Sequence, residues 1–214
     1  MIAPADRTAI EAEVAQLEAG SGVEVVTVVV GKSDVYPETV WKAFALGASL
    51  TALVLVTVDF LRATWPTQGQ ALWMALGILG MGAFWALAAI HVPAFTRWFL
   101  RASRAELETR QYADVQFLQR ELFATPSRTA VLVLVSMLER RVVIRADVGL
   151  RDRITVAEWD AIIAQMVPSL RVDAPGPAMR TGLRAMRELL AAKGLAPAAS
   201  SHRFGDAPIE VRGP

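Results

Sequence analysis

The sequence predicts an α/β fold, in which a small mixed sheet is sandwiched by helices and interrupted by a transmembrane helical hairpin. Residues 130–135 form a nearly unbroken apolar run rich in β-branched side chains, as expected for a strand covered on both faces. Amphipathic helical patterns precede and follow this run, and helices on both faces would bury it. Residues 43–58 and 71–90 carry no charge, which favours two membrane spans.

Composition agrees with a domain that carries a membrane insertion. The chain has 214 residues, of which 54% are hydrophobic, more than an ordinary soluble α/β domain of this size needs. The net charge of +1 and the lack of an aromatic–basic surface pattern indicate no nucleic-acid partner. The absence of cysteine excludes disulfides and thiolate zinc sites. The opening residues lack a basic region followed by an apolar one, so we expect no signal peptide.

The first elements are a helix and a strand. Residues 6–19 have apolar side chains on one helical face, and Thr8 with Glu11 has the spacing of a capping box. Residues 23–30 then form a second run of β-branched residues, which predicts a strand. Glu24 stands out as an acid on this otherwise apolar strand.

The membrane hairpin is predicted over residues 40–98, with spans at about 43–61 and 71–91. The 20 uncharged residues 71–90 would measure ~30 Å as a helix, the thickness of the bilayer hydrocarbon. Small residues repeat along both spans and would allow the helices to approach closely. The residues expected at this contact are Gly47, Thr51 and Gly82.

Positive charge sets the predicted orientation. The single arginine of the link is Arg62, whereas six basic residues flank the outer ends of the hairpin: Lys32, Lys42, Arg97, Arg101, Arg104 and Arg110. The positive-inside rule therefore places both termini in the cytoplasm.

The chain after the hairpin completes the domain. Residues 105–123 form an amphipathic helix that supplies the crossover to the strand at 130–135, and parallel pairing with the strand at 23–30 is the default. Residues 142–144 predict an antiparallel partner strand.

Two helices and a tail follow. Thr155 and Glu158 form a second capping box, and the helix behind it is expected to end at Pro168. After a Pro/Gly loop at 173–177 comes the last amphipathic helix. We expect 196–214 to be a loose tail, in which 209–212 could add a short edge strand.

In this prediction residues 1–34 and 105–195 form one discontinuous domain, and three of its segments carry a family resemblance. They are GVEVVTVVV at 22–30, ELFATPSRTAVLVLVS at 121–136 and LERRVVIRADVGLRDRIT at 138–155. Their strand patterns resemble those of the TPM domain, a Rossmann-like α/β family. The two-span insertion is similar to the subgroup of predicted bacterial membrane proteins, which implies a bacterial inner membrane.

The resemblance also implies chemistry, because some family members are described as acid phosphatases and some bind calcium. This sequence departs from the pattern of the secreted members at the strand-to-helix edge. Arg151 stands where they carry Glu, and Val156 where they carry Asp, whereas Asp147 is an acid in place of a Gly. The loss of two carboxylates weakens the expectation of phosphoryl hydrolysis or calcium binding.

Several charged residues are candidate site residues. Asp147, with Asp152 and Glu24, could ligate a divalent cation such as calcium, although turn and cap chemistry is the commoner role of short acids. Glu24 could instead pair with Arg128. Phosphate or lipid headgroups could meet three arginines, for which a solvated strand edge is the alternative: Arg128, Arg140 and Arg141.

The sequence therefore favours a non-enzymatic role. We expect a two-span inner-membrane protein whose cytoplasmic domain binds a membrane or envelope protein, in assembly or quality control. The alternative is a metal-dependent phosphatase-like hydrolase that uses Asp147. A transport subunit is a third reading, and it would require a homo-oligomer because two spans alone line no pore.

Overall fold

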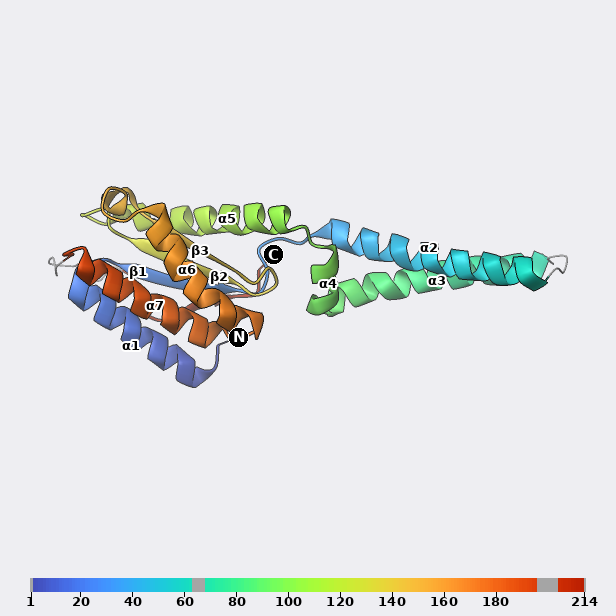
Figure 1. Cartoon of the computed structure of the whole chain (residues 1–214), viewed down its shortest axis with the longest axis horizontal. Coiled ribbons are helices and arrows are strands. Elements are labelled where there is room, and N and C mark those ends of the chain that lie inside the picture. The colour runs from blue at the N-terminus through green and yellow to red at the C-terminus, as the bar shows by residue number, and fades with distance from the viewer. Residues whose placement is uncertain (1, 63–67, 196–203, 214) are drawn as a thin grey trace. The chain divides into compact units, whose positions relative to one another are not determined.

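The computed structural model describes residues 2–62, 68–195 and 204–213 (Figure 1). The chain divides into two compact units. The first comprises Met1–Asp34 with Ser103–Pro214, and the second comprises Val35–Ala102. The first unit is an α/β domain, and in the described residues of the second the only secondary structure is helical.

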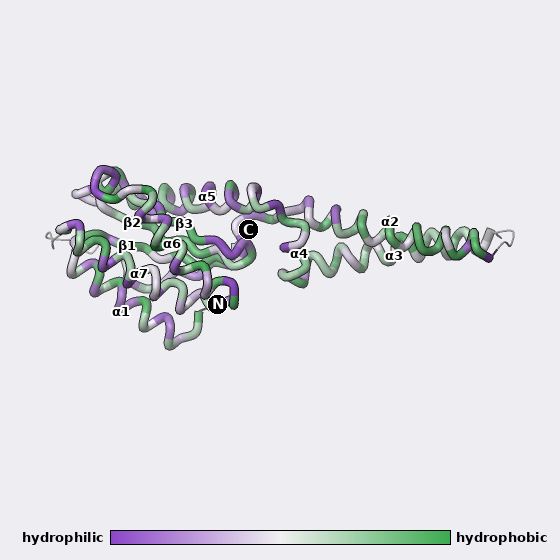
Figure 2. Tube along the Cα trace, viewed as in Figure 1, coloured by the Kyte–Doolittle hydropathy of each residue, from purple (hydrophilic) through white to green (hydrophobic). Residues whose placement is uncertain are grey.

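The second unit consists of three helices, α2 (Pro37–Arg62), α3 (Gln68–His91) and α4 (Pro93–Phe99). Two of them, α2 and α3, are long and apolar enough to cross a membrane, and they are coloured green along most of their length in Figure 2. Their large apolar side chains are mostly exposed, which suits a helix surrounded by lipid better than one in water. The expected link at 63–67 lies outside the described residues.

Close contact between α2 and α3 depends on two of the three small residues expected there. A Cβ on Gly47 would lie 2.8 Å from the Trp85 ring, and one on Gly82 would lie 2.9 Å from the Phe44 ring. Each glycine therefore makes room for an aromatic side chain of the other helix. Thr51 contributes differently, because its hydroxyl donates to the Gly47 carbonyl within α2 at 2.8 Å.

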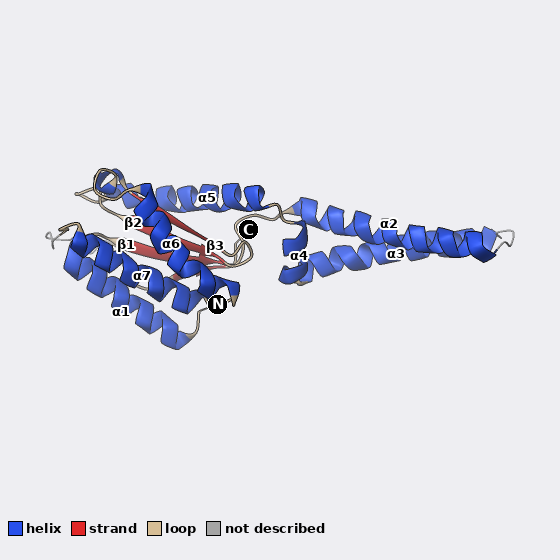
Figure 3. Ribbon diagram, in the orientation of Figure 1, coloured by secondary structure: helices blue, strands red, loops and turns tan. Residues whose placement is uncertain are grey.

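The first unit contains a four-stranded mixed sheet (Figure 3). Its strands are β1 (Val25–Val30), β2 (Val131–Ser136), β3 (Arg141–Ala146) and β4 (Ile209–Val211), in the spatial order β3-β2-β1-β4. β1 runs parallel to β2 and β4, and β3 is antiparallel to β2. The predicted parallel pairing of the first two strands is therefore confirmed.

Helices cover the sheet on both faces. They are α1 (Pro4–Ser21), α5 (Ala102–Gln119), α6 (Val156–Arg171) and α7 (Pro175–Ala192). Short 3-10 turns, η1 (Leu122–Ala124) and η2 (Val148–Leu150), follow α5 and β3. Side chains of α1, α6 and α7 share one apolar cluster with the sheet, and α5 contributes to the cluster on the other face. α5 thus lies in the crossover from β1 to β2, as predicted.

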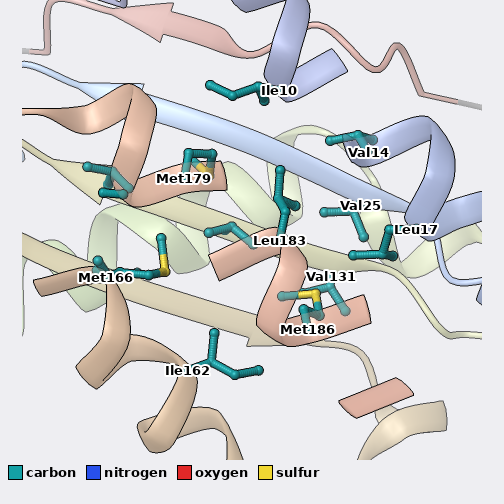
Figure 4. Close-up of a cluster of buried hydrophobic side chains, with 14 of the residues drawn as sticks. Ile10, Val14, Leu17, Val25, Val131, Ile162, Met166, Met179, Leu183 and Met186 are labelled. Carbon is teal, nitrogen blue, oxygen red and sulfur yellow. The ribbon is translucent and has the colours of Figure 1, made fainter. Parts of the chain in front are cut away.

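Every residue of β1 and β2 is buried, because successive side chains enter opposite clusters. Val25 and Val131 contribute to the larger cluster, whereas Val26 and Leu132 contribute to the smaller one. Figure 4 shows the larger cluster, with methionines of α6 and α7 around Leu183. Methionine adapts its shape to irregular gaps between helices, which suits this position.

Most helix ends predicted from local sequence signals lie within a few residues of the observed ends. The capping box of Thr155 and Glu158 is formed as predicted. α1 starts at Pro4 rather than at residue 6, and α7 starts at Pro175 within the expected loop. Both helix starts differ from the prediction for the same reason: proline is favoured in the first turn of a helix, where its missing N–H needs no partner.

The expected end of α6 at Pro168 is wrong, because the helix continues to Arg171. Proline removes one backbone hydrogen bond from a helix interior. The last turn nevertheless carries Leu170, which is completely buried in the larger cluster. Burial of that side chain offsets the lost hydrogen bond.

Within the expected loose tail, the short edge strand suggested at 209–212 is confirmed. Residues 196–203 lie outside the described residues, but Ile209–Val211 form the short edge strand β4 beside β1. Glu210 anchors this strand, since it accepts from the Ile2 amide at 3.1 Å and from the Arg7 guanidinium at 2.6 Å. The contacts of Glu210 are long-range, so the local sequence could suggest the strand but not its partners.

Replacing Gly82 with leucine tests the hairpin contact. We expect the free energy of unfolding of the hairpin to fall by about 1–3 kcal/mol, since the new side chain would overlap the Phe44 ring. The measurement is thermal unfolding of the full chain in detergent. Gly80→Leu is the matched control, because no atom lies within 4 Å of a Cβ at Gly80. Equal melting temperatures for the two variants would contradict the packing described.

Candidate functional site

Arg128 and Asp147 form the principal charged contact at the amino-terminal edge of the parallel strands. Arg128 precedes β2, and Asp147 follows β3, which runs the opposite way, so the two residues meet at one edge. The guanidinium donates to both carboxylate oxygens, with Nε–Oδ2 and Nη2–Oδ1 distances of 2.7 and 3.0 Å. Asp147 is buried, whereas about half of the Arg128 side chain is exposed.

Asp147 also caps the following 3-10 turn. Its Oδ1 accepts from the Val148 amide at 2.7 Å. Burial of the carboxyl opposes ionisation, but the hydrogen bonds from Arg128 and Val148 and the positive charge of Arg128 outweigh it, so the pKa of Asp147 lies below its ordinary value. The carboxylate is therefore fully engaged by donors of this chain.

The two loops that carry this pair are held together by their backbones as well. The Gly149 amide donates to the Arg128 carbonyl at 2.9 Å. A Cβ on Gly149 would lie 2.6 Å from that carbonyl oxygen, so the approach requires glycine. Arg128 itself has a φ of 54°, a left-handed conformation that arginine rarely adopts. These constraints fix the ion pair in place.

The predicted metal ligands do not form a cluster of carboxylates. Glu24 is buried just before β1, and Asp152 is exposed in the turn before α6. Within residues 2–62, 68–195 and 204–213, no group of three acidic or histidine side chains could hold a metal ion. Asp147 caps a 3-10 turn, which is the alternative role given for it from the sequence, and it also pairs with Arg128, which was not predicted.

The three predicted phosphate contacts are also separated. Arg140 and Arg141 lie at the opposite end of β2 from Arg128, because the hairpin between β2 and β3 carries them. Arg140 pairs with Asp173 at 2.8 Å, and Arg141 pairs with Glu106 at 3.5 Å. Each arginine thus has a carboxylate partner of its own, and the three do not make one anion-binding patch.

A hydrogen-bonded network at the carboxyl edge of the sheet is one feature that the sequence analysis missed. The Ser33 amide donates to Glu139 Oε1 at 2.8 Å, and the Ser33 hydroxyl donates to the Ser136 hydroxyl at 2.9 Å. Ser136 in turn donates to Glu139 Oε2. Both serines are buried, so the network joins the loops after β1 and β2 rather than presenting a nucleophile. Polar residues directly after two buried strands were the available signal.

A cleft of about 760 Å³ runs along the outer edge of β3. It is lined by six consecutive residues, 142–147, which are most of β3 and the residue after it. We call this cleft the β3 groove. Its volume is within the range of ligand-binding clefts. The groove arises from tertiary packing, so no local sequence motif predicts it.

Two helices form the walls of the β3 groove, and they differ in chemistry. The wall from α5 carries Arg110, Asp114 and Phe117. The wall from α6 carries Val156, Trp159, Asp160 and Ile163. A surface with apolar and charged walls beside a strand edge can bind an extended segment by both backbone and side-chain contacts.

Comparisons with known proteins identify part of this unit. Residues 100–189 match the family model of the TPM domain. The fold is similar to the NMR structure of BA42 protein from the psychrophilic bacterium Bizionia argentinensis, with a TM-score of 0.57 and 11% identity. That alignment covers 98% of this chain and 95% of the other. At this identity the likeness shows the fold alone. No curated protein matches the chain.

The Arg128–Asp147 pair predicts a specific pH dependence. Because the folded-state pKa of Asp147 is lowered, its contribution to stability is present above the ordinary aspartate pKa and is lost as pH falls through the folded value. We expect the free energy of unfolding of Asp147→Asn to be lower than that of the wild type at neutral pH, and the gap to narrow below about pH 4.

The measurement is urea unfolding of the full chain in detergent between pH 3 and 7, followed by tryptophan fluorescence. Asp152→Asn is the matched control, because this neighbouring acid is exposed and its replacement should leave the free energy of unfolding at neutral pH unchanged. A gap between Asp147→Asn and wild type that stays constant over this range would contradict the role of the pair.

Proposed function

We propose that this chain, which carries a TPM domain over residues 100–189, is a membrane-anchored binding protein. In this proposal α2 and α3 hold it in the bacterial inner membrane. Its α/β unit, in the cytoplasm, binds a membrane or envelope protein, as an accessory in assembly or quality control. The β3 groove is the observation that carries the proposal.

The chemistry of the α/β unit supports binding better than hydrolysis. A metal-dependent hydrolase needs an ion held by converging oxygen ligands, or a nucleophile that substrate can reach. Asp147 is instead buried against Arg128, and the hydroxyls of Ser33 and Ser136 are buried in a network with Glu139. The β3 groove, by contrast, is open along a strand edge and flanked by exposed apolar residues such as Val156.

Site-specific photo-cross-linking in cells tests the binding role. A photoreactive amino acid at Val156, on the wall of the β3 groove, should give a discrete adduct with another membrane or envelope protein. Val172 is a matched control: it is also a valine and also 75% exposed, but it does not line the groove. No adduct from Val156, or the same adducts from both positions, would count against the proposal.

Reporter fusions test the proposed topology. Basic residues flank the outer ends of the hairpin, whereas its link holds one arginine, so the positive-inside rule keeps the α/β unit in the cytoplasm. A reporter inserted at Pro66 should behave as external, and one at Pro214 as cytoplasmic. The reverse pattern would overturn the orientation.

A further inference from the structure

β3 ends the sheet on one side, and its outer edge lines the β3 groove, whose walls come from α5 and α6. We propose that this groove binds an extended peptide as an additional strand beside β3. The peptide alternates acidic with apolar residues. The inference rests on the proposed binding function and names the class of partner and the mode of recognition.

Backbone hydrogen bonding leaves one row of polar groups of β3 directed into the groove. Asp147 donates its amide to the carbonyl of Ala130, the residue opposite it, at 2.9 Å. Hydrogen-bonded pairs alternate along an antiparallel ladder, so every second residue back from Asp147 bonds to β2. The intervening residues direct their N–H and C=O groups outward: Val142, Ile144 and Ala146.

The groove follows the strand closely enough to accommodate another. All residues from 142 to 147 line it, including side chains that belong to both faces of the sheet. At about 3.3 Å per residue, that length corresponds to a peptide of roughly six residues. A site over one face would involve only alternate residues of β3, so the consecutive lining marks the strand edge itself.

The walls define what the peptide should carry. Its alternate side chains would lie against opposite walls, because side chains of a strand alternate between faces. On the α6 side they would meet Trp159 and Ile163, which favours apolar residues.

On the α5 side, two arginines and one acid line the groove, giving a net charge of +1 and favouring acidic residues. They are Arg110, Arg145 and Asp114. Both arginine side chains are about half exposed in their ion pairs, so they can exchange partners at little cost.

A second copy of the chain fits the groove less well than an acidic peptide. The only charged residues of β3 are Arg141 and Arg145, and both belong to the α5 face. Pairing of β3 with the β3 of another copy would bring like charges together across the new ladder, which opposes association.

Fluorescence anisotropy with the full chain in lipid nanodiscs tests the inference. The probe is a fluorescein-labelled peptide of four Glu-Val repeats, and its counterpart has four Lys-Val repeats. We expect the acidic peptide to bind roughly tenfold more tightly. Equal binding of the two peptides, or no binding of the acidic one, would overturn the proposal.

Hydrogen–deuterium exchange locates the bound peptide. Binding should slow exchange at the outward amides of Val142, Ile144 and Ala146, and leave Val143 and Arg145, already bonded to β2, nearly unchanged. Protection elsewhere would overturn the strand-addition mode. Protection of the outward amides without peptide, increasing with protein concentration, would show that a second copy of the chain occupies the groove. That result would also overturn the proposal.

A single substitution isolates the contribution of backbone hydrogen bonds to peptide binding. Ala146→Pro removes one outward N–H while leaving the ladder to β2 intact, because proline is tolerated on an edge strand. We expect it to weaken binding of the acidic peptide about fivefold, with unchanged thermal unfolding of the chain. Arg145→Gln tests the contribution of the charged wall, and it should also weaken binding of the acidic peptide.

Unchanged affinity in both variants would refute the site. If cross-linking from Val156 succeeds while the peptide fails to bind, the strand-addition mode is wrong and the binding function stands. If neither the cross-linking nor the peptide binding succeeds, the proposed binding function is wrong as well.

Discussion

Burial of β1 and β2 on both faces is the constraint on which the rest of this structure depends. All but one side chain of each strand are apolar and every one is buried, so each face of the sheet needs its own layer of helices. α5 covers one face, and α1, α6 and α7 cover the other. A parallel pair also needs a crossover, and the chain uses that connection to hold both α5 and the hairpin segment.

With both faces covered, polar chemistry is confined to the margins of the sheet. The amino edge carries the Arg128–Asp147 pair, and the carboxyl edge carries the network of Ser33, Ser136 and Glu139. Both sets join neighbouring loops and satisfy their own donors and acceptors. The lateral edge along β3 differs, because its outward amides and carbonyls lie in an open cleft. This difference is why we propose binding at the β3 edge rather than catalysis at either end.

Periodic and local signals were sufficient for most of the fold. The runs at 23–30 and 130–135 gave the central strands, and the Thr155 capping box gave the start of α6. The remaining features depend on contacts between distant segments. β4 is held by residues about two hundred positions earlier, such as Ile2, and α6 passes Pro168 because tertiary burial overrides local propensity.

The site was less accessible to sequence analysis than the fold. Asp147 and Arg128 were both singled out, but their mutual pairing was not foreseen, because the reversal of β3 is what brings them to one edge. The β3 groove could not be foreseen from periodicity, since a cleft between two helices is a product of how they pack. Arg141 did indicate a solvated strand edge, and β3 forms one edge of the sheet.

The long crossover has a consequence for the order of events during synthesis. One hundred residues separate Val30 from Val131, so β1 leaves the ribosome well before either neighbouring strand exists. The apolar helices α2 and α3 emerge in that interval. If α2 and α3 enter a membrane during synthesis, they do so while the first strand of the sheet is still unpaired. Delayed insertion would lengthen the time during which a strand of nearly pure valine is exposed to aggregation.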